Sequence, residues 1–337
     1  MSRRSAVVAV PAAWVAFALL LAACRGPAGD PAAAPTPTSP AGSPASASTA
    51  PPATSSASGP ISSPAGGSTP AGQSERLPTL PRGGRTLFPG WRIVAYYGAA
   101  GTAALGVLGA GTPDQVWPRL AADAARFGTG QTKALPTYEL ISVIANATPG
   151  PDGKYRSRVD DATIGRYLAA VRRHHALLLL DIQPGHADFP TEARRLERWL
   201  REPDVALAID PEWRMSAGGV PGQRIGTVSA AEVNTVSAWL DGLTARHRLP
   251  QKLLLIHQFT TGMITNKRAV QPRRNLAMVF NMDGFGGREA KLAKYRMLAA
   301  DRRFGLGLKL FLRQDVAIFR PHEVLRLRPV PDVVEYQ

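Results

Sequence analysis

The sequence predicts an α/β fold: a (β/α)8, TIM-like barrel that follows an apolar N-terminal segment and a Pro-rich linker. Two observations favour the barrel. Short apolar runs alternate with helical stretches from Trp91 to Gln337, as in parallel sheets built from strand–helix units. That part of the chain also has nearly the ~250 residues of a typical (β/α)8 barrel.

The N-terminal segment has the pattern of an export signal. A basic head, Met1–Arg4, precedes an apolar run, Ala6–Ala23, that ends in Leu-Ala-Ala-Cys at Cys24, the one cysteine of the chain. Such a head and run are typical of secretory signal peptides. The four residues resemble a bacterial lipobox, which implies cleavage before Cys24 and its diacylation with palmitate-like chains. The alternative is a single membrane-spanning helix, for which the run is close to the lower length limit.

The composition changes after Cys24. Pro, Ala, Ser, Thr and Gly dominate, and no aromatic residue occurs between Gly26 and Phe88. Such a segment cannot bury enough apolar surface to offset the entropy lost on ordering. We therefore predict a lipoprotein signal peptide at 1–23, a disordered linker at 24–84 and the barrel at 85–337. We expect the protein to be anchored through Cys24 at the extracytoplasmic face of the cell membrane. The sequence does not distinguish export by the Sec route from export by the twin-arginine route.

The formal net charge of +15 does not by itself indicate a nucleic-acid site. Many arginines occupy predicted helix surfaces, for example Arg172, Arg173, Arg194 and Arg195, without interleaved aromatic residues, which favours a solvated basic surface. The CxxC, HExxH, P-loop and GxGxxG patterns are absent. We expect no nucleic-acid partner, no cofactor and a monomer. A metal site built from Asp181, Asp210, His257 and Asp283 is chemically possible but has no spacing signature, so none is predicted.

The predicted strands and helices alternate along the barrel. The strands are Arg92–Tyr97, Glu139–Ala147, Ala176–Ile182, Val205–Asp210, Lys252–Phe259, Leu276–Asp283, Phe304–Leu312 and Asp332–Tyr336. The helices are Pro113–Phe127, Asp161–His174, Thr191–Arg201, Ala230–His247 and Arg288–Leu298. No closing helix follows the eighth strand in this sequence. We expect the segment Gly83–Gly90 to cover the bottom of the barrel in its place.

Alternation within the strands predicts which residues face the barrel axis. In the fourth strand, small Ala206 and Ala208 lead inward to Asp210 and Glu212. In the seventh, Gly305 and Gly307 leave Lys309 inward. The same parity brings Asn281 and Asp283 inward from the sixth strand, Tyr97 from the first and Glu335 from the eighth. The third and fifth strands have leucines at both parities, so Asp181, Gln183 and His257 are placed by their position at strand ends.

These polar residues converge on the C-terminal face, where enzymes of this fold have their active sites. Carboxylates that share a cavity shift one another's pKa apart, so that one keeps a proton while another is ionised. Glycoside hydrolysis needs such a pair, and aromatic faces can support sugar rings. The candidate catalytic residues are Glu212, Asp210 and Asp283. The candidate substrate-binding residues are Tyr97, Asp181, Trp213, His257, Asn281, Lys309 and Glu335.

Each candidate also has a purely structural interpretation. Asp210-Pro211 and Asp283-Gly284 are common turn pairs, and Glu212 follows in a turn where a solvated Glu is common. Lys309 can neutralise a buried carboxylate, and His257 can be a hydrogen-bonded core histidine. Tyr97 can be a packing residue.

The chain resembles surface lipoproteins of high-GC Gram-positive bacteria that carry a glycoside-hydrolase-like barrel. Asp210-x-Glu212 on the fourth strand, with Asp283 on the sixth, is similar to the family 25 lysozymes, and family 18 chitinase-like proteins also end this strand in Asp-x-Glu. The resemblance to the lysozymes implies that Glu212 is the catalytic acid and that Asp210 and Asp283 support the reaction.

The first strand reads Val94-Ala95-Tyr96-Tyr97-Gly98. It lacks the Asp of those lysozymes, the His of phosphodiesterase-like barrels and the HxH of metal amidohydrolases. We therefore expect a surface-anchored, glycoside-hydrolase-like barrel that acts on a polysaccharide or cell-envelope glycan by carboxylate acid/base catalysis. The alternative is a non-catalytic barrel that binds a glycan or another surface ligand in the same cleft.

Overall fold

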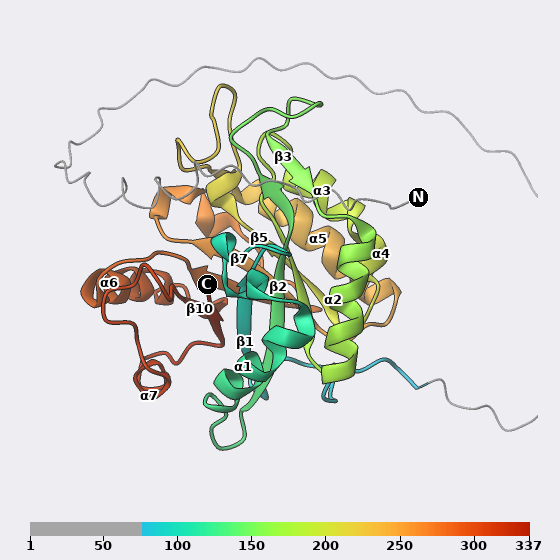
Figure 1. The fold of residues 1–337 in the computed structure, drawn as a ribbon, viewed down its shortest axis with the longest axis vertical. Helices are drawn as coiled ribbons and strands as arrows, with labels where there is room; N and C mark the ends of the chain where they lie inside the picture. Colours follow the sequence, from blue (N-terminus) through green and yellow to red (C-terminus); the bar gives the residue numbers. More distant parts are fainter. Residues whose placement is uncertain (1–75) are drawn as a thin grey trace, which may run out of the picture. The chain divides into compact units, whose positions relative to one another are not determined.

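The computed structural model describes residues 76–337, in which eight parallel strands close into a barrel with helices between them (Figure 1). Each barrel strand pairs with its neighbours in the order β1-β11-β10-β9-β7-β5-β4-β2, and β2 pairs with β1 to complete the ring. The predicted (β/α)8 fold is confirmed. The barrel strands are β1 (Trp91–Gly98), β2 (Lys133–Ala145), β4 (Leu177–Ile182), β5 (Val205–Ile209), β7 (Lys252–Gln258), β9 (Leu276–Met282), β10 (Gly305–Leu310) and β11 (Val333–Tyr336).

The helices lie outside the strands and begin at recognisable caps. Thr112 and Gln115 form a capping box at the first helix, and Ser229 accepts a hydrogen bond from the backbone of Glu232 at the longest one. The predicted stretch Thr191–Arg201 is divided into two short helices. The helices are α1 (Pro113–Ala125), α2 (Asp161–His174), α3 (Phe189–Arg195), α4 (Glu197–Leu200), α5 (Ala230–Arg246), α6 (Arg288–Ala299) and α7 (Pro321–Val324).

Among the described residues, three short strands outside the barrel lie in the loops on its C-terminal side. The strand β3 (Arg156–Arg158) runs antiparallel to the end of β2. Two-residue strands β6 (Val228–Ser229) and β8 (Ile264–Thr265) pair with each other. None of the helices within residues 76–337 combines the length and apolar character that a membrane crossing requires.

Alternate residues of each strand face the axis, as the sequence predicts. Gly305 and Gly307 on β10 and Ala206 and Ala208 on β5 leave room along the axis for larger side chains from other strands. The structure also settles the two ambiguous strands, since Leu179 of β4 and Leu255 of β7 belong to the inner cluster. The inner apolar cluster is Leu80, Leu87, Ile93, Leu135, Leu177, Leu179, Ala206, Ala208, Leu253, Leu255, Ala277, Val279 and Val333.

The segment before β1 closes the N-terminal end of the barrel. Leu87 is fully buried in the inner apolar cluster, and its backbone N–H donates to the side chain of Gln251, the residue before β7. Arg85 donates to the backbone carbonyls of Arg248 and Leu249. This is the covering role expected of Gly83–Gly90. Leu80, within the range assigned to the linker, is 2% exposed and packs in the same cluster.

The signal peptide, Cys24 and the linker up to residue 75 lie outside the described residues. Their assignments stay predictions.

Candidate functional site

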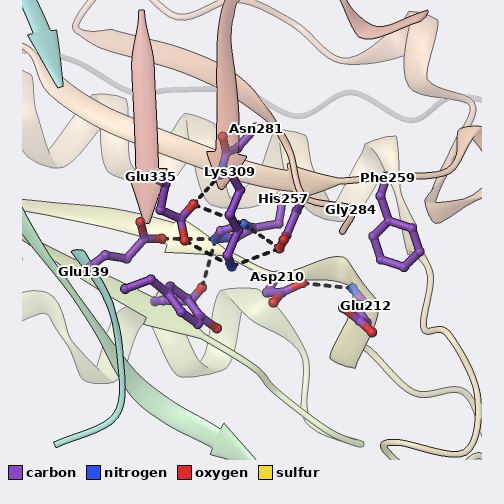
Figure 2. A network of polar contacts seen from close by, with 12 residues as sticks. Glu139, Asp210, Glu212, His257, Phe259, Asn281, Gly284, Lys309 and Glu335 are labelled. Atoms are coloured by element: carbon purple, nitrogen blue, oxygen red, sulfur yellow. Dashed lines mark hydrogen bonds and ion pairs between the residues drawn. The ribbon is translucent and has the colours of Figure 1, made fainter. Parts of the chain in front are cut away.

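Charged and polar side chains fill the C-terminal end of the barrel interior. Each continues the inward-facing set of its strand, above the aliphatic layers of the inner cluster, so the strand alternation positions it. Several of them point toward one another in Figure 2. The set consists of Tyr97 (β1), Glu139 (β2), Asp181 (β4), Asp210 (after β5), His257 (β7), Asn281 and Asp283 (β9 and its end), Lys309 (β10) and Glu335 (β11), and all are buried.

His257 lies at the centre of this set. Its Nε2 is 3.0 Å from Glu139 Oε1 and 3.9 Å from Asp181 Oδ1. On the other side of the ring, Nδ1 is 2.9 Å from Asp283 Oδ2. The imidazole therefore joins carboxylates from opposite parts of the barrel wall, with one acidic group close to each nitrogen.

Lys309 neutralises the side of the cluster near Asp283. Its Nζ lies 3.2 Å from Asp283 Oδ2 and 3.0 Å from Glu335 Oε1. The same ammonium stands 3.6 Å from the centroid of the Tyr97 ring, a favourable cation–π distance. Asn281 Nδ2 donates to Glu335, and a Cβ on Gly307 would come within 2.3 Å of Asn281 Oδ1. Glycine at 307 is therefore required for Asn281 to occupy this position.

Tyr97 and Gln183 hold Asp181 from the other side. Gln183 Nε2 donates to the Tyr97 hydroxyl at 2.9 Å, and Gln183 Oε1 accepts from the backbone of Ala145. The Tyr97 hydroxyl makes a long contact of 3.4 Å with Asp181 Oδ2. The ends of β1, β2 and β4 are thus linked by side-chain contacts.

Glu212 has a different setting from the buried carboxylates. It lies in the 3₁₀ turn Pro211–Trp213, which Asp210 caps by accepting the Glu212 backbone N–H at 3.2 Å. Glu212 and Trp213 are partly exposed, as is Phe259, whereas Asp210 is buried. Figure 2 shows Glu212 and Phe259 to one side of the buried cluster. The turn therefore places a carboxyl and the Trp213 ring at the mouth of the barrel, and Phe259 follows the end of β7.

The environment separates the pKa values of these carboxyls. Burial, and next the charge of Asp283, raise the pKa of Glu212 to about 7. Burial opposes ionisation of Asp283 as well, but Lys309 and His257 outweigh it and hold the pKa of Asp283 well below its usual value. Asp283 is thus ionised at neutral pH, whereas Glu212 retains a proton for part of the time.

The remaining buried acids hold their protons more tightly than free carboxyls. Burial followed by the charge of Glu335 raises the pKa of Glu139 to about 7. Burial also raises the pKa of Asp181 to about 7 and the pKa of Asp210 well above its usual value. Burial and Lys309 work against the charged imidazole, but Glu335 and Asp283 prevail and raise the pKa of His257.

Several polar atoms of the cluster are buried without a hydrogen bond. Within the described part of the chain, all such side-chain atoms belong to this one cluster: Glu139 Oε2, Asp181 Oδ1 and Asn281 Oδ1. The buried atoms His257 Nδ1 and Glu335 Oε1 have the charged partners Asp283 and Lys309. An unsatisfied buried polar group costs ~1–3 kcal/mol. The stability of the barrel is therefore reduced here, which is typical of functional sites rather than of packing cores.

The structure brings eight of the ten predicted site residues into the buried cluster. The other two, Glu212 and Trp213, lie in the turn at the mouth. Glu139 was missed, because the second strand was predicted to begin at this residue. The strand instead begins at Lys133, and the inward parity of Leu135 leads directly to Glu139. Extending the apolar pattern backward through Tyr138 and Leu135 would have found it.

The cluster also contains three side chains of the types that bind metal ions. One donor atom each from Glu139, His257 and Glu335 lie within 4.8 Å of one another. The chemical capabilities of this end of the barrel are therefore proton transfer at Glu212, charge stabilisation by Asp283 and coordination by Glu139, His257 and Glu335.

Comparisons with known proteins give few matches. No family model matches the sequence, and no curated protein matches it. Among solved structures, the chain is similar to a GH5 xyloglucan-specific endo-beta-1,4-glucanase from a metagenomic library, solved in complex with cellotriose. The identity is 11%, the TM-score is 0.34, and the match covers 60% of this chain and 74% of that one. The fold assignment above rests on the strand topology of this chain.

Proposed function

We propose that this protein is a glycoside hydrolase that acts on a polysaccharide or a cell-envelope glycan, with Glu212 as proton donor. The observation that carries the proposal is geometric: a turn holds Glu212 partly exposed at the mouth, while Asp283 is buried against Lys309 and His257. Glu212 has a pKa of about 7 and is partly exposed, whereas Asp283 is held ionised. When their environments push the pKa values of two carboxyls apart in this way, the protonated one can act as general acid and the ionised one can stabilise positive charge.

The surrounding residues fit these roles. Asp210 fixes the turn that carries Glu212 through the hydrogen bond to its backbone, so it positions the acid. Asp283 supplies negative charge that favours a developing oxocarbenium ion. Trp213 and Phe259, both partly exposed, offer ring faces for sugars at the mouth of the barrel. Tyr97, Asp181, His257, Asn281, Lys309 and Glu335 maintain the charge state of the buried floor.

The test compares the parent chain with Glu212→Gln on a set of defined polysaccharides. A proton donor contributes ~10²–10⁴-fold to the rate, so we expect a loss of that size in kcat, with binding of the same sugar nearly unchanged. Glu197→Gln is the matched control, because Glu197 pairs with Arg201 on α4, outside the cluster. A Glu212→Gln chain that cleaves a substrate of the parent at the parent rate would exclude Glu212 as the acid.

A second candidate is a non-catalytic barrel that binds a glycan at its mouth. Its supporting observation is that Asp210 and Asp283 are at most 6% exposed, which leaves Glu212 as the accessible member of the three candidate catalytic carboxyls. If the parent hydrolyses no glycan but binds one by titration calorimetry, and Glu212→Gln weakens this binding, the binding function is supported instead.

We also propose that the chain is exported and anchored to the membrane through a lipid on Cys24, with the barrel outside the cytoplasm. The lipobox-like Leu-Ala-Ala-Cys and the Pro-rich composition that follows support this. Cys24→Ala is expected to release the protein into the medium or to leave an uncleaved precursor, and Ser46→Ala serves as the control. A Cys24→Ala chain of mature mass that still fractionates with membranes would contradict the anchor.

A further inference from the structure

The floor of the barrel mouth contains more buried acceptors than donors. Three of its buried oxygens, Glu139 Oε2, Asp181 Oδ1 and Asn281 Oδ1, accept no hydrogen bond, and a fourth, Glu335 Oε1, has the Lys309 ammonium at 3.0 Å as its ion-pair partner. These atoms are contributed by four different strands and meet around one histidine. Buried acceptors of this kind call for an occupant that supplies positive charge or protons.

We propose that Glu139, His257 and Glu335 bind a divalent transition-metal ion. One donor atom from each lies within 4.8 Å of the others, and all three side chains are fully buried. The residues come from β2, β7 and β11, which are held in the closed barrel by their strand pairings. Each donor is thus carried by a rigid strand rather than by a loop.

The residues around these three orient them for coordination. Asp283 Oδ2 lies 2.9 Å from His257 Nδ1, which favours the tautomer with its proton on Nδ1 and leaves the Nε2 lone pair toward Glu139. A carboxylate behind a metal-binding histidine is the usual supporting arrangement. Glu335 is held in the same way by the amide of Asn281.

A divalent metal ion bound by Glu139, His257 and Glu335 would balance the negative charges of its ligands. The two positive charges of the ion would be matched by the carboxylates of Glu139 and Glu335, and the ion would take the place of the proton on His257 Nε2. The ammonium of Lys309 is matched by Asp283, at 3.2 Å. Within the described residues, no lysine or arginine forms an ion pair with Glu139, whose partner is His257 Nε2 at 3.0 Å.

The donor set indicates the kind of ion. One imidazole and two carboxylates suit Zn²⁺, Mn²⁺ or Co²⁺, whereas Ca²⁺ and Mg²⁺ prefer oxygen ligands alone. The sequence predicted no metal because these residues have no recognisable spacing. The proposal concerns binding and does not depend on glycan hydrolysis, so each can fail without the other.

The first experiment measures metal content. The full chain is treated with a chelator, dialysed against Zn²⁺ or Mn²⁺ and analysed by mass spectrometry for bound metal. We expect one ion per chain. Co²⁺ should give a visible absorption spectrum distinct from that of the hexaaqua ion, because a histidine nitrogen replaces water. Retention of less than a tenth of an equivalent of each ion, or an unchanged aqua spectrum, would overturn the proposal.

The second experiment tests the donors. Glu139→Gln and His257→Gln are expected to weaken binding at least 10-fold, whereas Glu212→Gln, which removes a carboxyl outside the donor set, is expected to bind as the parent does. Circular dichroism in chelator establishes that each variant is folded. Equal binding by all three variants would place the ion elsewhere and overturn the assignment. If a variant does not fold, the Co²⁺ spectrum of the parent chain decides whether a histidine nitrogen binds the ion.

Discussion

The two ends of the barrel are built from the same strands but differ in the chemistry of their interiors. At the N-terminal end the inward residues are aliphatic, and Leu80 and Leu87 close the opening. At the C-terminal end the inward residues are acids, a lysine, a histidine, a tyrosine and an asparagine. The change occurs within two or four residues along each strand, as from Leu179 to Asp181. The lesson is that stability is concentrated at one end, which allows the other to carry groups that are costly to bury.

The two ends also differ in how they treat a buried lysine, as the pKa values of Lys252 and Lys309 show. Lys252, at the start of β7, donates to the backbone carbonyls of Glu202 and Val205 at 2.7 and 2.6 Å, and burial lowers its pKa to about 7. Lys309 is also buried, but Asp283 and Glu335 overcome that effect and raise its pKa. Burial therefore weakens the charge at one end, and ion pairing maintains it at the other.

The largest effect on stability is expected from Lys309→Met. Removal of the ammonium leaves Asp283 and Glu335 buried without their cation, which costs ~3–5 kcal/mol in the free energy of unfolding. Lys252→Met is the matched control at the other end, with an expected cost of ~1–3 kcal/mol from carbonyls that lose their donor. Urea unfolding at pH 7 measures both. Equal costs would mean that ion pairing does not distinguish the two ends.

The apolar end is tested by Leu87→Ala. Truncation of this fully buried side chain is expected to cost roughly 2–5 kcal/mol through lost burial and a residual cavity. Leu77→Ala is the control, because Leu77 is 44% exposed and its truncation should change stability by less than ~0.5 kcal/mol. The pKa of Glu212, followed by carbon NMR, is expected to stay the same in Leu87→Ala. A shift in that pKa would show that the two ends are coupled.

The charged end should also make stability depend on pH. The pKa of Glu139 is raised from 4.5 to about 7, so between these values the folded chain keeps a proton that the unfolded chain has lost. Its contribution to stability therefore falls as pH rises from about 4.5 to about 7. One pKa unit corresponds to ~1.4 kcal/mol, so the change from this residue is about 3 kcal/mol.

Unfolding free energies measured across this pH range in the presence of a chelator, so that Glu139 holds no metal ion, check the sign. The parent should lose stability with rising pH, and Glu139→Gln should have a smaller slope because the titrating group is gone. Glu197→Gln, a substitution on the surface of α4, is expected to keep the parent slope. A Glu139→Gln slope equal to that of the parent would contradict the raised pKa.

The sequence alone determined the barrel and the inward faces of most of its strands. Side chains alternate with a period of two residues, so Gly305, Gly307 and Lys309, or Ala206, Ala208 and Asp210, can be sorted without any knowledge of their neighbours. The parity rule would have included Glu139 as well, had the second strand been extended back to Lys133. The export signal and the lipidation of Cys24 also come from the sequence, and they stay predictions.

Only the tertiary structure decided which of these residues meet. His257 stands between Glu139 and Asp283, more than a hundred residues from the first and on a different strand from each. Likewise, the turn at Pro211 determines that Glu212 is partly exposed while Asp210 is buried. Contacts across a barrel depend on how its strands tilt and stagger on closure. The pKa values then follow from those distances, because charge interactions depend on separation in space and on burial rather than on position in the sequence.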